Sequence, residues 1–369
     1  MPDPIEKILV RGLNWLGDSI MSTPALQRLR EARPRAHITL LAPEKLAELW
    51  QDQPFLDSVL TFAPTQTIWH VARLLRAENF SEAVAFPNSI RSALELRLAG
   101  IPRRIGLARP GCGFLLTRAL PPRPDARPMR ILSAGKIRRL IARHAPPATI
   151  PSIAHHIHDY LYLTAELGAS REPLPPRIFV DTERTTIVSQ KLRLKNVREG
   201  RPWFGLNPGA EYGPAKRWPA ERFAAAAMAL QKETKCRWLI FGGPKDMELA
   251  EKVTTEIRYV THEADGAINL AGKTSLKELT AALKICRLLL TNDSGPMHLA
   301  AAVGTPVVVL FGSTSPELTG PTFSPNAQIV RTPVSCAPCF RRECPIDLRC
   351  LSGIEIDQVL AAARRILNI

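Results

Sequence analysis

Three segments of the chain combine charged side chains with glycines that let the backbone approach a ligand closely. The first, RGLNWLGDS over residues 11–19, follows an apolar run and places Asp18 where a helix is expected to begin. A carboxylate at that position can cap the exposed N–H groups of the helix. It can equally serve as a general base that takes a proton from a hydroxyl group, a contribution of about 10² to 10⁴ in rate. Both interpretations of Asp18 stay open on the local residues alone.

The second segment, NPGAEYGPAKRWP over residues 207–219, directly follows a predicted strand. Its glycines permit close approach of the backbone to a ligand, and Lys216 with Arg217 offers positive charge just before a helix with Pro219 in its first turn. This combination predicts a phosphate-binding loop. The alternative is a surface loop with ordinary basic residues.

The third segment, LTNDSGPMHLAA over residues 290–301, takes a strand into a helix at Asp293. The amides of Ser294 and Gly295 then lie at a helix N-terminus, where the dipole attracts a diphosphate. Asp293 can bind sugar hydroxyls or only cap the helix. His298, one turn further, is either a packed core histidine or a ligand-binding side chain.

Other motifs exclude several functions. GAINLAGKT over residues 266–274 resembles a phosphate-binding P-loop, but five residues separate its glycines where four are required, so we do not expect triphosphate hydrolysis. No Gly-x-Gly-x-x-Gly follows a strand, which argues against a nicotinamide dehydrogenase. Four cysteines stand within 15 positions, at Cys336, Cys339, Cys344 and Cys350. They could bind zinc, but their spacing matches no familiar zinc motif, and a packed loop of reduced thiols is the alternative.

The elements that must position these motifs alternate between short β-branched runs and helical patterns, which predicts parallel sheets covered on both faces. The expected segments are strands at 7–13, 37–41, 83–86, 203–207, 237–241, 287–291 and 306–311, and helices at 18–32, 43–52, 89–99, 131–144, 155–167, 220–232, 246–258, 275–284 and 294–303. The proline cluster at 172–176 predicts a linker. We therefore expect an α/β protein of two Rossmann-like domains, 1–176 and 177–369, whose ligands bind at the carboxyl ends of the strands, in a cleft where two such edges face each other.

Composition adds an expected partner and an expected location. The 369 residues are 45% hydrophobic and 22% charged, with a net charge of +15, and the segment 101–145 carries ten Arg and one Lys against Asp125 alone. Such a one-sided block predicts an anionic partner, namely a phosphorylated glycolipid, a membrane surface or nucleic acid; a solvated basic face is the alternative. No apolar run is long enough to span a membrane and no secretory signal precedes the first strand, so we expect a cytoplasmic protein.

Taken together, the three motifs give the chain a family resemblance. It resembles the ADP-heptose:lipopolysaccharide heptosyltransferases, glycosyltransferase family 9 of GT-B architecture, and is most similar to the type II group, which adds the second core heptose. The resemblance is strongest over 8–26, 207–223, 241–246, 269–279 and 289–313, with FPNSIRS at 86–92 and the cysteine loop as further matches. It implies an inverting transfer of heptose from ADP-L-glycero-D-manno-heptose to the first heptose of the inner core. A related transferase that uses another nucleotide sugar, or a type I or type III enzyme, is the alternative.

The resemblance also assigns roles to residues. Asp18 is expected to deprotonate the acceptor hydroxyl. The donor-binding set comprises Lys216, Asp246, Asp293, Ser294, Gly295 and His298. Lys216 and the backbone amides of Ser294 and Gly295 are expected to bind the diphosphate. Asp293 is expected to bind the heptose, and Asp246 the ribose. Asn88, Ser89 and Arg91 are expected to contact the acceptor.

Partners follow from the same resemblance. The acceptor is heptosylated Kdo-lipid A, so the protein is expected at the inner leaflet of the inner membrane, where the basic insertion around 101–150 of the first domain meets phosphorylated lipid. The final helix could pack back on that domain. No nucleic acid, cofactor or metal is expected.

Overall fold

The structure, a computed structural model, describes residues 5–111, 113–193 and 200–369. Contacts divide the chain into two compact units, Met1–Ala126 with Ile153–Phe179, and Arg127–Ser152 with Val180–Ile369. The last change of unit lies near the linker expected at 172–176. The segment Arg127–Ser152, however, packs with the second unit, whereas the sequence analysis placed it in the first.

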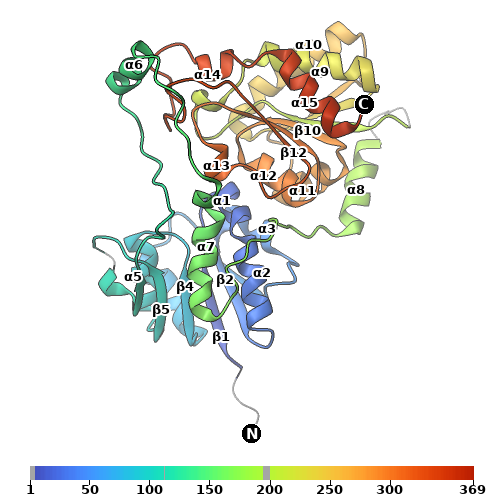
Figure 1. Ribbon diagram of the computed structural model, residues 1–369. Coiled ribbons are helices and arrows are strands. Elements are labelled where there is room, and N and C mark those ends of the chain that lie inside the picture. Colours follow the sequence, from blue (N-terminus) through green and yellow to red (C-terminus); the bar gives the residue numbers. More distant parts are fainter. Residues whose placement is uncertain (1–4, 112, 194–199) are drawn as a thin grey trace. The chain divides into compact units, whose positions relative to one another are not determined.

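The first unit alternates strands and helices (Figure 1). Its strands are β1 (Lys7–Arg11), β2 (His37–Pro43), β3 (Ser58–Phe62), β4 (Glu82–Ala85), β5 (Arg103–Leu107) and β6 (Arg118–Leu120). Its helices are α1 (Leu16–Met21), α2 (Thr23–Ala32), α3 (Ala47–Trp50), α4 (Ile68–Ala77), α5 (Ile90–Leu98) and α7 (Ile157–Thr164), with short 3₁₀ turns η1 (Glu44–Leu46), η2 (Gly113–Leu115), η3 (Ser152–Ala154) and η4 (Ala165–Leu167).

One helix was expected over 18–32, but the structure has two. The break falls at Ser22, because Pro24 near the start of α2 has no N–H to continue the hydrogen bonds of α1. The hydroxyl of Ser22 bonds instead to the carbonyl of Ser19 at 2.7 Å. The short helix α1 therefore stands alone directly after β1, and it carries Asp18.

The second unit repeats the same plan. Its strands are β7 (Trp203–Asn207), β8 (Arg237–Ile240), β9 (Ala267–Asn269), β10 (Leu288–Asn292), β11 (Val307–Phe311) and β12 (Ala327–Arg331). Its helices are α6 (Ala134–Ala142), α8 (Thr182–Arg193), α9 (Ala220–Thr234), α10 (Met247–Thr261), α11 (Leu276–Ile285), α12 (Gly295–Ala302), α13 (Pro316–Thr319), α14 (Arg349–Ser352) and α15 (Ile356–Leu367), with η5 (Pro214–Lys216) and η6 (Pro244–Asp246).

In the described part of the chain, each unit holds one six-stranded parallel sheet, in the order β3-β2-β1-β4-β5-β6 and β12-β11-β10-β7-β8-β9. Both orders place the first strand of the unit beside the fourth, which is the dinucleotide-binding arrangement with its switch point between those two strands. Strands such as β10 and β11 are buried along their whole length, as expected for a parallel sheet covered on both faces. The predicted class of two Rossmann-like α/β units is confirmed.

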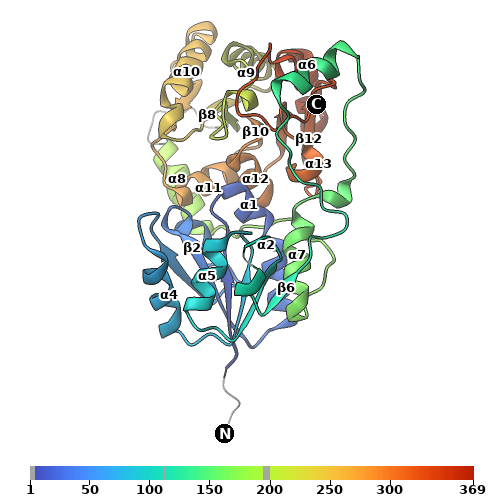
Figure 2. The same cartoon turned by 90° about the vertical axis from the view of Figure 1, so that its left-hand side faces the viewer.

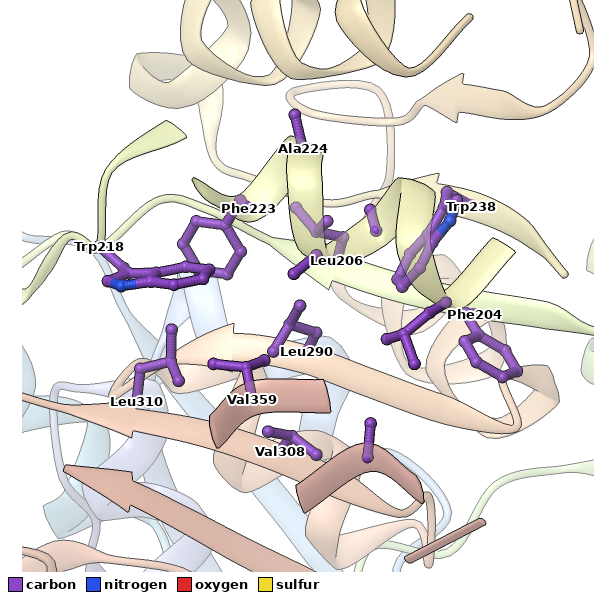
Figure 3. Close-up of a cluster of buried hydrophobic side chains, with 14 of the residues drawn as sticks. Phe204, Leu206, Trp218, Phe223, Ala224, Trp238, Leu290, Val308, Leu310 and Val359 are labelled. Atoms are coloured by element: carbon purple, nitrogen blue, oxygen red, sulfur yellow. The ribbon is translucent and has the colours of Figure 1, made fainter. Parts of the chain in front are cut away.

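The core of the second unit holds the start of α9 and the loop before it (Figure 3). Trp218 packs edge-on against Phe223, with ring centroids 5.0 Å apart, and its indole N–H donates to the carbonyl of Ile354 at 3.2 Å. Burying a large aromatic side chain is worth about 1.5 to 3 kcal/mol. Trp218 therefore fixes the end of the loop 207–219 to the core.

Helix α6 packs on the cysteine loop, which we define as residues 336–350. Ile137 is buried in a cluster with Cys336 and Cys339, and the N–H of Leu132 donates to the carbonyl of Cys339 at 3.0 Å. Both ribbon views draw α6 beside the segment that leads to α14 (Figures 1 and 2). These apolar contacts explain why Arg127–Ser152 groups with the second unit.

The last helix also belongs to the second unit, where α15 contacts β12 and α9. From the sequence, packing of this helix on the first domain was also possible. Within the described residues, no helix is both long and apolar enough to cross a membrane.

Candidate functional site

The switch point of the second sheet brings together the loops that follow β7 and β10. Asn207, the last residue of β7, donates from its amide to Ser294 Oγ at 3.2 Å and to the carbonyl of Gly209 at 3.2 Å. Asn292, the last residue of β10, donates to the carbonyl of Pro208 at 2.7 Å and accepts from the N–H of Trp218 at 3.0 Å. The two asparagines thus bind the second and third motifs into one site.

Sequence reasoning missed both asparagines. A polar amide that ends an otherwise apolar buried strand was the available signal, because a buried amide must find hydrogen-bond partners.

A buried ion pair lies at the centre of this site. Lys216 Nζ is 2.5 Å from Asp293 Oδ2, and Thr314 Oγ1 donates to the same oxygen at 2.6 Å. Burial alone would raise the pKa of Asp293, but the charge of Lys216 and the two hydrogen bonds outweigh it and hold that pKa below its ordinary value. Asp293 is therefore ionised, and with Oδ2 occupied its orientation is fixed. Thr314 was not among the expected site residues.

The N-terminus of α12 lies directly after Asp293. Ser294 is the N-cap residue, but its hydroxyl lies within hydrogen-bond distance of Asn207 Nδ2 and Thr291 Oγ1 and makes no side-chain cap bond. Gly295 is the first helical residue and Pro296, which follows, has no N–H. The first-turn amides are thus not capped by the side chain of Ser294, as an anion-binding helix end requires.

His298 is buried one turn into α12. Burial, with a further contribution from Lys216, lowers the pKa of His298 to about 4, although Asp293 acts in the opposite direction. The imidazole is therefore neutral at physiological pH and adds no charge to the site.

Arg217 and Asp246 form a second ion pair beside the first. Arg217 Nη2 is 3.1 Å from Asp246 Oδ1, while Asp246 Oδ2 accepts from the N–H of Gly243 at 3.2 Å. Gly209 makes this possible, because a Cβ there would lie 2.4 Å from Asp246 Cγ. The sequence predicted positive charge at Lys216 and Arg217, and the structure pairs each of them with one of the predicted donor-binding aspartates.

Asp18 lies in the first unit, in the first turn of α1 after β1. The N-cap residue of α1 is Trp15, so Asp18 is not the capping residue. Its side chain is half-buried. Tyr160 of α7 is close enough that, after burial, the carboxylate of Asp18 is the next cause of the raised pKa of its phenol. The charge of Asp18 thus acts on Tyr160, whose ring lies 5.3 Å from that of Phe86.

The predicted acceptor-binding residues follow β4, the strand next to β1. Ser89 caps α5 by accepting from the N–H of Ser92 at 3.2 Å. Arg91 pairs with Glu95 at 2.8 Å. Asn88 Oδ1 is a buried oxygen with no hydrogen-bond partner among the described residues. These residues therefore gather at the switch point of the first sheet.

Arg11 joins this group, although the sequence analysis gave it no role. It ends β1, pairs with Glu95 at 3.0 Å and lies over the ring of Phe62, with its guanidinium carbon 4.4 Å from the ring centre. Glu95 is fully buried and pairs with both Arg11 and Arg91, so its single negative charge leaves this group with a net positive charge. The feature of the sequence that could have pointed to Arg11 is a lone arginine at the end of an apolar strand.

The cysteine loop contains free thiols. Cys336, Cys339 and Cys350 are buried and Cys344 is half-buried. Burial raises the pKa of Cys350 to about 12. Across the residues that the structure describes, no three side chains of metal-ligand type are arranged to hold an ion.

Solved structures identify the class to which this fold belongs. The chain is similar to the structure of Escherichia coli ADP-heptose lipopolysaccharide heptosyltransferase II, with 27% identity, a TM-score of 0.76 and 98% of each chain covered. It is also similar to a glycosyl transferase family 9 structure from Veillonella parvula, with 25% identity, a TM-score of 0.78, and 100% and 99% covered. The protein is a glycosyltransferase with the GT-B fold.

Sequence comparison identifies the family. The profile of glycosyltransferase family 9 (heptosyltransferase) matches residues 68–349. Lipooligosaccharide heptosyltransferase 2 of Haemophilus influenzae is 32% identical over 332 residues, and lipopolysaccharide heptosyltransferase 2 of E. coli strain K12 is 29% identical over 331; each alignment covers 88% of both chains. The chain belongs to glycosyltransferase family 9, the heptosyltransferases.

Proposed function

We propose that this enzyme transfers heptose from ADP-L-glycero-D-manno-heptose to the first heptose of the lipopolysaccharide inner core. The observation that carries the proposal is the Lys216–Asp293 pair at the uncapped end of α12, on the switch point of the second sheet. Ligands of such sheets bind outside the carboxyl ends of the strands at that point. Relatives named lipopolysaccharide or lipooligosaccharide heptosyltransferase 2 support heptose as the sugar and lipopolysaccharide as the acceptor. The first heptose as the acceptor residue follows from the resemblance of the sequence to the type II group.

The donor is held by the second unit in this proposal. Lys216 and the amides of Ser294 and Gly295 bind the diphosphate. Asp293 has one carboxylate oxygen, Oδ2, committed to Lys216 and Thr314, so Oδ1 accepts from heptose hydroxyls. His298 stays neutral beside the same site. Asp246 acts at the ribose end of the donor, where its bonds to Arg217 and to the N–H of Gly243 stabilise the loop.

The chemistry is a single displacement with inversion. Asp18 takes the proton of the acceptor hydroxyl while that oxygen attacks the anomeric carbon of the donor, the bond from that carbon to the phosphate oxygen breaks, and ADP leaves. Base catalysis contributes about 10² to 10⁴ in rate. Each charge-stabilising donor to the leaving diphosphate contributes about 3 to 4 kcal/mol. Asn88, Ser89 and Arg91, at the switch point beside Asp18, position the acceptor.

We further propose that the enzyme works at an anionic membrane surface, with the segment 127–143 as its contact. Of the basic insertion, Arg103, Arg118 and Arg123 are paired with acidic residues of the first unit. Six of the eight other cations are exposed side chains of the second unit, at Arg127, Arg130, Lys136, Arg138, Arg139 and Arg143; Arg104 and Arg109 belong to the first unit. Met129 and Ile131, 49% and 66% exposed, stand among them. Cations mixed with exposed apolar side chains fit an anionic bilayer.

Incubation of ADP-heptose with truncated lipopolysaccharides that carry no heptose, one heptose or two tests the main proposal. Extension of the one-heptose acceptor alone is expected. Extension of the acceptor with no heptose, or of the two-heptose acceptor, would instead indicate a type I or type III enzyme. A thermal shift with UDP and none with ADP would indicate a different donor.

A further inference from the structure

The donor site described above is almost neutral. Lys216 is paired with Asp293 at 2.5 Å and Arg217 with Asp246 at 3.1 Å, so both cations of the loop 207–219 are balanced by carboxylates. A diphosphate brings several negative charges, and removing them from water is costly unless cations compensate them. A site for a nucleoside diphosphate therefore calls for a further cation nearby.

Arg342, on the cysteine loop, is placed to supply that charge. Its guanidinium carbon lies 5.3 Å from the centre of the Tyr212 ring, and Lys216 Nζ lies 4.8 Å from the same centre. The side chain is exposed, and no carboxylate among the described residues forms an ion pair with it. Two cations therefore lie near the Tyr212 ring: Lys216, whose charge is balanced by Asp293, and Arg342, whose charge is not balanced by a carboxylate in the described part of the chain.

Backbone contacts hold Arg342 in this place. Its carbonyl accepts from the N–H of Ala215 at 2.9 Å, and the hydroxyl of Tyr212 donates to the carbonyl of Phe340 at 2.7 Å. A Cβ on Gly213 would lie 2.6 Å from the carbonyl oxygen of Arg342, and the positive φ of Gly213 (149°) also disfavours any other residue. The two loops are therefore in direct backbone contact, with a glycine where they meet.

We propose that Arg342 is a further phosphate-binding residue of the donor site, and that the cysteine loop is the scaffold that carries it there. The inference rests on the proposed function, because the anion is the diphosphate of the donor. A guanidinium suits this role, since its fork of N–H groups can bind two phosphate oxygens at once. Cys336 and Cys339 then have a structural purpose: they pack the loop against α6, and so hold the arginine next to Tyr212.

Calorimetric titration of the full-length protein with ADP and with adenosine tests this proposal. Arg342→Gln is expected to weaken ADP binding about tenfold, which corresponds to about 1.4 kcal/mol, and to leave adenosine binding unchanged. Arg342→Lys should recover part of the loss, and the salt dependence of ADP binding should be steeper for the original protein than for Arg342→Gln. Arg349→Gln is the matched control, because it removes an arginine of the same loop that is already paired with Asp347 at 2.8 Å.

Equal ADP affinity for Arg342→Gln and the original protein would overturn the assignment while leaving the proposed function intact. An equal loss for adenosine and ADP would also overturn it, because it would indicate a disturbed loop rather than a lost phosphate contact. If the original protein binds UDP instead of ADP and Arg342→Gln weakens UDP but not uridine, the phosphate role is supported and the proposed donor is wrong. Failure of the original protein to bind either diphosphate would overturn both.

Discussion

Lys216 Nζ and Asp293 Oδ2 lie 2.5 Å apart and join two loops whose sequences are separated by 77 positions. Asp293 is 4% exposed, so its carboxylate depends on this partner for compensation. We expect Lys216→Met to lower the free energy of unfolding by about 3 kcal/mol, because it leaves a buried carboxylate unpaired. Urea unfolding followed by circular dichroism measures the change.

The double variant Lys216→Met/Asp293→Asn separates the ion pair from side-chain packing. It should recover much of the lost stability and still bind ADP poorly. Lys252→Met, which removes an exposed pair with Glu221 at 2.5 Å, serves as control and should change stability little. A double variant as unstable as Lys216→Met alone would show that the pair is not the source of the loss.

His298 makes stability depend on pH. Its pKa in the folded protein is lowered to about 4 from 6.5, so the unfolded chain binds the proton more readily between these values. Stability contributed by the neutral imidazole is present above pH 6.5 and is lost as the pH falls toward 4. The free energy of unfolding is expected to drop over this window by at most about 3 kcal/mol on account of His298.

Replacing His298 with Asn should flatten that pH dependence, measured as urea unfolding at several pH values. His262→Asn is the control, since His262 is exposed and its left-handed backbone suits asparagine. Identical slopes for His298→Asn and the original protein would contradict the prediction.

In the proposed mechanism Asp18 takes part in catalysis and not in donor binding. We expect Asp18→Asn to lower kcat about 10²- to 10⁴-fold, because the amide cannot accept the proton of the acceptor. The affinity for ADP should not change, since the donor residues belong to the second unit. Initial rates and calorimetry measure the two effects. Asp125→Asn, at an exposed carboxylate of the same unit, should keep full activity; retained turnover in Asp18→Asn would remove Asp18 from the role of base.

The segment 127–143 governs binding to membranes in our proposal. The triple variant Lys136→Gln/Arg138→Gln/Arg139→Gln should reduce co-sedimentation with phosphatidylglycerol vesicles at least tenfold, at about 1 kcal/mol per cation. Transfer to a detergent-dispersed acceptor should remain near the original rate. Lys232→Gln/Lys245→Gln/Arg365→Gln removes three exposed cations elsewhere in the same unit and should bind vesicles normally. Equal binding by all three proteins would contradict a role for this segment.

Much of the fold could be predicted, because parallel strands that are buried on both faces occur in the sequence as continuous apolar runs. The runs at β7, β10 and β11 fall within a residue or so of their predicted positions. Strands that are short, or that mix buried and exposed residues, were not predicted. Strand β6 has three residues, two of them exposed, and β9 has three residues. A run of that length does not reveal a periodicity.

The residue types of the candidate site can be read from the sequence, but the pairings between them cannot. The charge pattern pointed to Lys216 and Arg217 as positive charges but did not reveal that Asp293 and Asp246 neutralise them. Which acid meets which base depends on the order of the strands, and a sequence window around Arg217 does not contain Asp246. The same reason explains why Arg342 was overlooked, since only the folded loops place it beside Tyr212.

The grouping of residues 127–152 with the second unit has a practical consequence for dissecting the enzyme. A single cut in the gene at the proline linker cannot yield an intact second unit, because that piece would lose Ile137 and expose the apolar surface of Cys336 and Cys339. Exposed patches of this kind promote aggregation. A stand-alone half needs both pieces in one polypeptide, with residues 127–152 spliced ahead of residue 180.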